Sequence, residues 1–95
     1  MIEIDKCPCC QEGQLGYRLC GDRETVVILC SECAMVWLHP SKLEADQARD
    51  PVAQDFARHH PQVQLRNSRW ATPEEVSQWG WAAYLLKPSE LLENS

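Results

Sequence analysis

The sequence predicts a small α+β domain stabilised by a metal ion, with three short antiparallel strands in residues 1–40 and short helices after them. Two Cys-x-x-Cys pairs, Cys7/Cys10 and Cys30/Cys33, are separated by 19 residues. The segment between them has the alternation and turn residues of a β-hairpin, and helix-start signals appear only after residue 40. At 95 residues the chain is one domain, near the size at which a hydrophobic core alone is thin.

The two cysteine pairs predict a structural Zn²⁺ site. A Cys-x-x-Cys turn directs both sulfurs to one point, so two such turns complete a tetrahedral shell of four thiolates. A closed shell leaves no position for a reacting water, which makes the metal structural rather than catalytic. Cys9 competes with Cys10 as a ligand, but only Cys10 has the Cys-x-x-Cys spacing from Cys7. His39 is the one other rival, and four cysteines make it unnecessary.

Three strands are expected around this site. Leu15, Tyr17 and Leu19 alternate with polar or small residues and predict the first strand. Gly21-Asp22 offers a turn, and the β-branched run at residues 25–29 predicts the second strand. Residues 35–38 follow the second cysteine pair and predict a third.

Residues 5–40 resemble the zinc-ribbon family, through the segments CPCC at 7–10 and CSEC at 30–33 and the hairpin between them. The resemblance implies a structural zinc on Cys7, Cys10, Cys30 and Cys33. It does not select a function, because zinc ribbons occur in transcription factors, ribosomal proteins, enzymes and adaptors. One departure is visible: ribbon knuckles often carry Gly after the second cysteine, whereas Gln11 and Ala34 stand here.

Residues 41–95 are predicted to form a helical tail packed on the ribbon of residues 1–40, as one compact unit. Ser41 to Glu44 fit a capping box, and Asp50-Pro51 fit the start of a helix that places Val52 and Phe56 on one face and stops at Pro61. A last short helix is expected from Pro88.

The strongest helix signal is Thr72-Pro73-Glu74-Glu75, with Thr at the N-cap, Pro at N1 and Glu at N3. We expect this helix to run through Trp79, with Gly80 as its C′ residue. The tail from Arg69 to Trp81 resembles the C-termini of small bacterial zinc-ribbon proteins.

The alternatives to a structural metal site fit less well. Three disulfides would require export, and residues 1–15 lack the apolar core of a secretory signal, so we expect a cytoplasmic protein with reduced thiols. The segment after Cys10 is a poor helix start for a redox Cys-Pro-x-Cys site. The His-x-Glu of zinc deaminases is missing from the sequence. We therefore expect no enzymatic activity and no small-molecule substrate, and we interpret Cys20 as a small buried hydrophobe.

Charge and tryptophan content favour a protein partner. The formal net charge is −5, from 14 acids and 9 bases, which disfavours general binding to nucleic acid. No stretch is long enough to span a membrane. Of the four tryptophans, at least two are expected to pack the tail onto the ribbon, and the others to anchor a partner. The preferred function is a non-catalytic zinc-binding interaction module, such as an acidic immunity-type inhibitor of a basic toxin. The candidate partner-binding residues are Trp70, Trp79, Trp81, Arg66 and Arg69.

A nucleic-acid-associated zinc ribbon is the alternative. Residues 56–71 contain no acid but include Arg58, Arg66 and Arg69, and an exposed Trp would stack on bases. A weaker hypothesis is a redox or metal-delivery role for Cys9 and Cys20.

Overall fold

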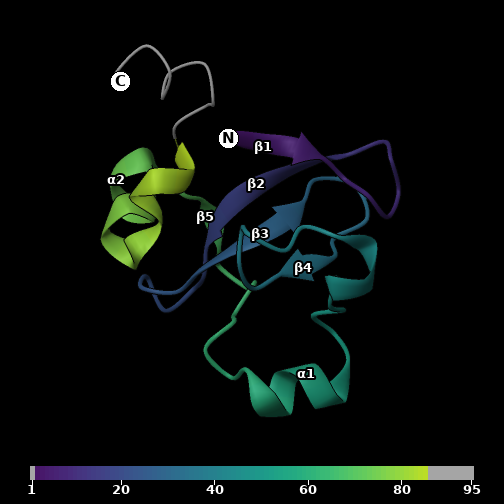
Figure 1. The fold of residues 1–95 in the computed structure, drawn as a ribbon. Coiled ribbons are helices and arrows are strands. Elements are labelled where there is room, and N and C mark those ends of the chain that lie inside the picture. The colour runs from purple at the N-terminus through teal and green to yellow at the C-terminus, as the bar shows by residue number, and fades with distance from the viewer. Residues whose placement is uncertain (1, 86–95) are drawn as a thin grey trace.

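A computed structural model describes residues 2–85, which form a small α+β fold (Figure 1). The strands and helical turns, in chain order, are β1 (Glu3–Lys6), β2 (Gln14–Leu19), β3 (Val26–Cys30), β4 (Val36–Trp37), η1 (Ala45–Gln47), α1 (Gln54–His59), β5 (Arg69–Trp70), α2 (Pro73–Val76), η2 (Ser77–Trp81) and η3 (Ala82–Leu85). The helix expected from Pro88 lies outside the described residues.

The sheet is antiparallel, in the order β1-β2-β3-β4, and β5 adds to β2. The three expected strands are present as β2, β3 and β4, but the expected count of three is wrong because β1 and β5 join them. Both added strands pair with the same edge of β2: β1 with residues 14–16 and β5 with Arg18 and Leu19. The amide of Ala71 also donates to the Tyr17 carbonyl, so this edge of β2 is paired along its whole length.

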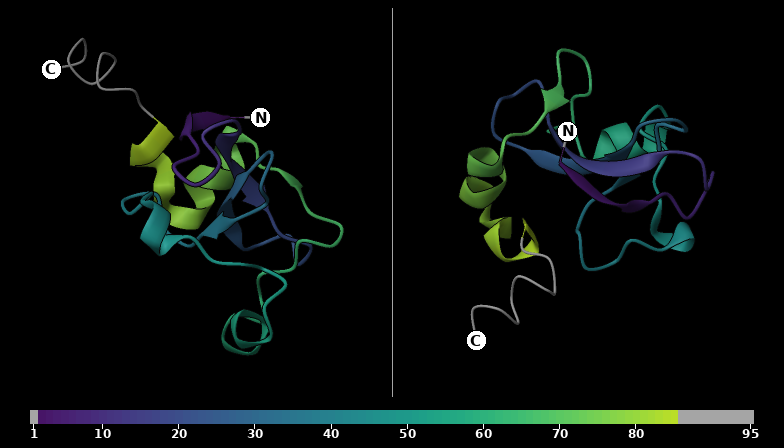
Figure 2. Two further views of the ribbon diagram at one scale, coloured as in Figure 1. Left: turned by 90° about the vertical axis from the view of Figure 1, so that its right-hand side faces the viewer. Right: turned by 90° about the horizontal axis from the view of Figure 1, so that it is seen from above.

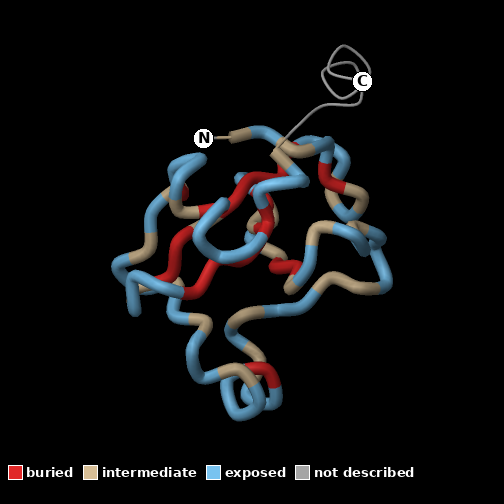
Figure 3. The backbone as a smooth tube through the Cα atoms, turned by 60° about the vertical axis from the view of Figure 1, so that its left-hand side comes forward, coloured by how far each residue is buried: buried red, intermediate tan, exposed pale blue. Residues whose placement is uncertain are grey.

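Both faces of the sheet are covered, each by its own hydrophobic cluster. Most of the buried segments run through the middle of the molecule (Figure 3). One cluster joins Tyr17, Ile28 and Trp37 to Val76 and Trp81 of the C-terminal turns, and the other packs Val27 and Val36 against Phe56 of α1, with further buried residues in each. Strand side chains alternate between faces, so two-sided burial explains why residues 26–30 read as one apolar run. The α1 and α2 helices stand well apart in all views (Figure 2).

Two of the expected helix starts do not form as predicted. The Ser41 hydroxyl lies 2.7 Å from His39 Nδ1 instead of capping a helix, and the turn η1 begins at Ala45 without a side-chain cap. The Asp50 carboxylate accepts the amide of Val52, so it closes a local turn and α1 begins only at Gln54. Val52 consequently points to solvent, 85% exposed, whereas Phe56 is buried as expected.

The ends of the helices follow the sequence more closely. The helix α1 finishes at His59, just before Pro61. The Thr72–Glu75 capping box is confirmed, with Pro73 at the first position of α2. A wider helical turn, η2, continues α2 through Trp79. The helical backbone conformation is interrupted at Gly80, whose φ is 103°. No helix within residues 2–85 is long and apolar enough to cross a membrane.

Candidate metal centre

The four cysteines of the two Cys-x-x-Cys pairs come together in one cluster. The Sγ atoms of Cys7, Cys10, Cys30 and Cys33 all lie within 4.8 Å of one another. The Cys7–Cys33 and Cys10–Cys30 sulfurs are 3.7 and 3.6 Å apart. A tetrahedral shell with metal–sulfur bonds of ~2.3 Å has sulfur–sulfur edges of ~3.8 Å, whereas a disulfide would need ~2.05 Å. The cluster therefore fits a single four-coordinate metal ion and not a pair of disulfides.

Two backbone turns of the same kind present the sulfurs. The first knuckle closes when the Gln11 amide donates to the Cys7 carbonyl, at 3.0 Å. The residues that follow the second cysteine of each pair, Gln11 and Ala34, have φ values of 58° and 60°. These are left-handed conformations, in which glycine has the least strain. The sequence lacks the expected glycines, but the backbone adopts the knuckle conformation without them.

Gly13 is part of the centre, and sequence reasoning did not identify it. A Cβ atom built on Gly13 would lie 2.6 Å from Cys30 Sγ and 2.9 Å from the Glu32 side chain. The Gly13 amide also donates to Cys10 Sγ at 3.4 Å. The only signal available in the sequence was a glycine three residues after Cys10.

Backbone amides and burial set the charge state of the sulfurs. Hydrogen bonds from the amides of Glu12 and Gly13 lower the pKa of the Cys10 thiol to about 6. Burial raises the pKa of Cys33 to about 12 and also raises that of Cys30. A coordinated thiol is deprotonated, so binding of a dication would release protons from these buried thiols.

The remaining candidate ligands lie outside the cluster. The Cys9 side chain is exposed, and its sulfur is 3.9 Å from the Ala45 carbonyl oxygen. Cys20 is 0% exposed in the cluster around Phe56, as expected for a small buried hydrophobe. His39 contacts Ser41 through Nδ1. The predicted set of four cysteines is therefore the set that the fold assembles.

The candidate partner-binding tryptophans differ in exposure. Trp81 is only 7% exposed and packs on Tyr17, and Trp37 is fully buried. Trp70 is half-buried beneath the Arg18 guanidinium, whose carbon lies 4.7 Å from the ring centroid. Trp79 is 41% exposed. Trp81 thus belongs to the core, and Trp79 offers the most surface to a partner.

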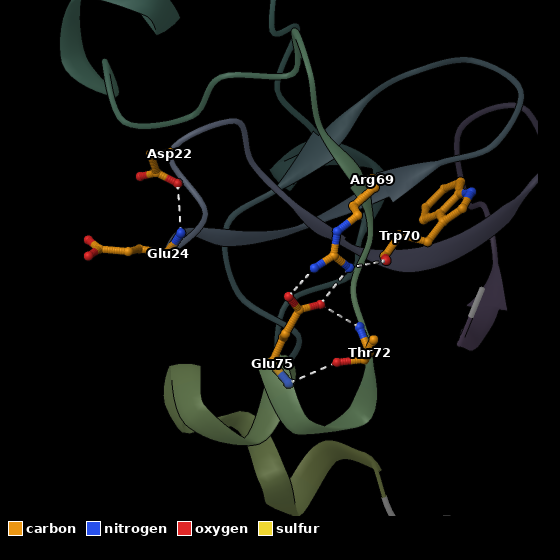
Figure 4. A network of polar contacts seen from close by, with 6 residues as sticks. All are labelled: Asp22, Glu24, Arg69, Trp70, Thr72 and Glu75. Carbon is orange, nitrogen blue, oxygen red and sulfur yellow. Dashed lines mark hydrogen bonds and ion pairs between the residues drawn. The ribbon is translucent and has the colours of Figure 1, made fainter.

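The two candidate arginines also differ. Arg69 forms an ion pair with Glu75, in which Nη1 donates to Oε1 at 2.8 Å (Figure 4). The same Glu75 carboxylate accepts the Thr72 amide, at 2.9 Å, so Arg69 reinforces the capping box. The hydrogen bond from Arg69 is the main reason that the pKa of Glu75 lies below its usual value. Arg66 is exposed.

Trp79 stands at a groove of about 360 Å³ between the β2–β3 turn and the C-terminal helical turns. Its lining residues are Leu19, Arg23, Glu24, Glu75, Gln78 and Trp79. Arg23 has a φ of 64° because it belongs to the tight turn between β2 and β3, in which its amide donates to the Cys20 carbonyl at 3.0 Å.

Comparison of the chain with family models, curated proteins and solved structures finds no match. The four-cysteine cluster and the groove are thus interpreted from their own geometry.

Proposed function

We propose that the protein is a non-catalytic module that folds around one structural Zn²⁺ in a zinc-ribbon-like half and binds a basic protein partner. The cluster of four cysteine sulfurs carries this proposal, because a four-thiolate shell is complete without water or substrate. The metal then contributes folding free energy to a short chain instead of chemistry.

Zinc is proposed because soft thiolates in a tetrahedral set favour zinc or iron. Elemental analysis of the purified protein tests the choice. One zinc per chain, retained through gel filtration, supports it. One iron per chain, with the colour of an iron–thiolate centre, would contradict the zinc assignment and indicate a redox-active site.

The proposed partner surface is the groove beside Trp79. An exposed tryptophan is the residue type most enriched among binding hot spots. The charged residues that line the same groove are Glu24, Arg23 and Glu75, and Glu75 is paired with Arg69. The net charge of −5 would speed association with a positively charged protein. An inhibitor of a basic toxin is one form of this function.

Affinity capture from an extract of the source cells, followed by mass spectrometry, tests the partner hypothesis. We expect a basic protein to be retained by the wild type, released by salt, and lost with Trp79→Ala. Val52→Ala is the matched control, since Val52 is an exposed apolar residue that does not line the groove. Equal capture by Trp79→Ala and the wild type would exclude the groove, and capture of no protein would count against the function.

The nucleic-acid alternative rests on the exposed Arg58 and Arg66, in a segment with no acid between residues 56 and 71. Arg69 belongs to that segment, but its charge is paired with Glu75. The test is binding of a fluorescent single-stranded oligonucleotide over a series of salt concentrations. Salt-dependent binding that Arg66→Gln weakens would favour this function over the protein partner.

A further inference from the structure

A second pocket, separate from the cysteine cluster and from the Trp79 groove, gathers basic side chains. It has a volume of about 170 Å³ and is lined by Leu38, His39, Lys42, Gln47 and Arg49. Three of these five residues are basic and none is acidic, in a protein whose formal net charge is −5. The pocket lies where the chain leaves β4 and passes through η1.

His39 is held in one orientation by its neighbours. The Ser41 amide donates to His39 Nδ1 at 3.1 Å, so the proton of the neutral imidazole is assigned to Nε2. The ring also packs edge-on against Trp81 and Tyr84, with centroids 5.6 Å away in both cases. The imidazole is thus fixed with a hydrogen-bond donor at Nε2.

Backbone pairing positions Arg49 beside β4. Its amide donates to the Val36 carbonyl at 2.7 Å, and its carbonyl accepts the Val36 amide at 2.9 Å. Lys42 sits in a turn that the His39 carbonyl closes, with an N···O distance of 3.4 Å. The two cations therefore reach the pocket from segments that are anchored independently.

Within residues 2–85 neither cation has an ion-pair partner, although Arg49 Nη1 donates to the Ala48 carbonyl at 3.4 Å. Among residues 2–85 the ion pair is Arg69–Glu75, and it lies elsewhere. The acids nearest in sequence are Glu44, Asp46 and Asp50, and none of them lines the pocket. Lys42 and Arg49 thus bring two positive charges to the same space.

We propose that this pocket binds a phosphate group. Lys42 and Arg49 supply two formal positive charges, which match the charge of −1.5 to −2 on a phosphate monoester near neutral pH. A carboxylate would neutralise only one of them. A guanidinium fork, an ammonium, an imidazole N–H and the Gln47 amide provide donors for several phosphate oxygens.

The size of the pocket agrees with this ligand. At ~30 Å³ per water molecule, its volume equals about six waters, which is enough for a phosphate group. The shared chemistry is therefore the phosphate itself, whether free or attached to a small molecule such as a nucleoside.

Titration of the zinc-loaded, ¹⁵N-labelled protein with inorganic phosphate at constant ionic strength tests the proposal. We expect saturable shifts confined to the amides of residues 38, 39, 41, 42 and 47–49. Arg49→Gln and Lys42→Gln should each weaken the apparent affinity about tenfold, because each removes charge-assisted hydrogen bonds. Lys6→Gln, which removes an exposed lysine that lines neither pocket, should leave it unchanged.

Three further measurements make the result decisive. Native mass spectrometry after the titration confirms that zinc is retained and that each variant is folded around it. Acetate in place of phosphate should bind at least about tenfold more weakly. If a nucleoside monophosphate binds more tightly than inorganic phosphate, the ligand is a phosphate carried by a small molecule. If the two bind equally, the ligand is the free anion. Shifts that do not saturate, equal weakening by Lys6→Gln, or equal binding of acetate would overturn the proposal.

Discussion

At the scale of single residues, Ala34 carries strain that a glycine would remove. A residue with a side chain pays ~1–2 kcal/mol to adopt its φ of 60°. Glycine avoids this strain, but it loses more backbone entropy on folding, which costs ~0.5–1 kcal/mol. We predict that Ala34→Gly raises the free energy of unfolding of the zinc-loaded protein by about 0.5–1 kcal/mol, measured by urea denaturation. Ala82 is also exposed but has a right-handed φ of −55°. Ala82→Gly should therefore lower the free energy of unfolding by a similar amount. If both substitutions changed the free energy of unfolding in the same direction, the strain at Ala34 would not be its cause.

Gly13 is constrained by space and not by dihedral angle. A Cβ at this position would meet Cys30 Sγ at 2.6 Å, so Gly13→Ala must shift either this ligand sulfur or the backbone whose amide bonds Cys10 Sγ. We predict that it weakens zinc binding by at least about tenfold and alters the d–d absorption bands of the Co²⁺-substituted protein. Gly80 provides the contrast, because a Cβ there meets nothing within 4 Å although its φ is 103°. Gly80→Ala should lower stability and leave the Co²⁺ spectrum as in the wild type; altered bands in both variants would refute the steric account.

At the scale of elements, the N-terminus of α2 combines a capping box with an ion pair, and two substitutions separate them. Thr72→Ala removes the hydroxyl that accepts the Glu75 amide and should cost about 1 kcal/mol of stability. Glu75→Gln keeps a residue able to complete the capping box but removes the ion pair with Arg69, which should cost only about 0.2–1 kcal/mol. Urea denaturation at pH 7 measures both.

The pH dependence of the Glu75→Gln effect follows from the lowered pKa of Glu75. A carboxyl whose folded pKa is depressed contributes stability above its unfolded value of ~4.3, and loses it only as the pH falls through the folded value. The difference in unfolding free energy between the wild type and Glu75→Gln should therefore be constant from pH 6 to pH 8. A difference that shrinks within that range would show that the pair does not form as described.

The sequence predicted the elements whose signals are local. The cysteine spacing, the alternation of residues 15–19 and the Thr72 capping box each specify a short segment by itself, and each is present. Elements that depend on distant partners were missed. In β1 only Ile4 is apolar, and β5 spans two residues, so both exist because β2 offers them an unpaired edge. Asp50 shows the converse, since its carboxylate closes a turn with Val52 instead of starting the helix.

The candidate site was predictable to the same extent. The spacing of the four cysteines identifies the ligands, because each pair is formed within one turn. The contact of Gly13 with Cys30, and the grouping of Lys42 with Arg49, join residues that no periodicity connects. The same is true of the Trp79 groove, whose lining comes from β2, from the turn after it and from the C-terminal turns.

At the scale of the whole molecule, the metal site and both hydrophobic clusters share β3, so they should fold as one unit. Cys30 ends this strand, Ile28 belongs to one cluster, and Val27 to the other. A domain of 95 residues has a net stability of about 5–14 kcal/mol, and a structural zinc contributes about 10–16 kcal/mol. Loss of the metal should therefore unfold the sheet and both clusters together.

We predict that a chelator abolishes the amide protection of β2 and β3 and the fixed environment of Trp37 in a single transition. Hydrogen exchange measures the amide protection, and near-ultraviolet circular dichroism measures the environment of Trp37. Cys33→Ser should prevent folding even with excess zinc, because it removes one of the four ligands. Cys9→Ser is the matched control: it changes a cysteine of the same knuckle that lies outside the cluster, and it should fold and bind one zinc as the wild type does. If the chelated protein kept its protected β2–β3 amides, the core would be sufficient alone and the metal would need a role other than folding.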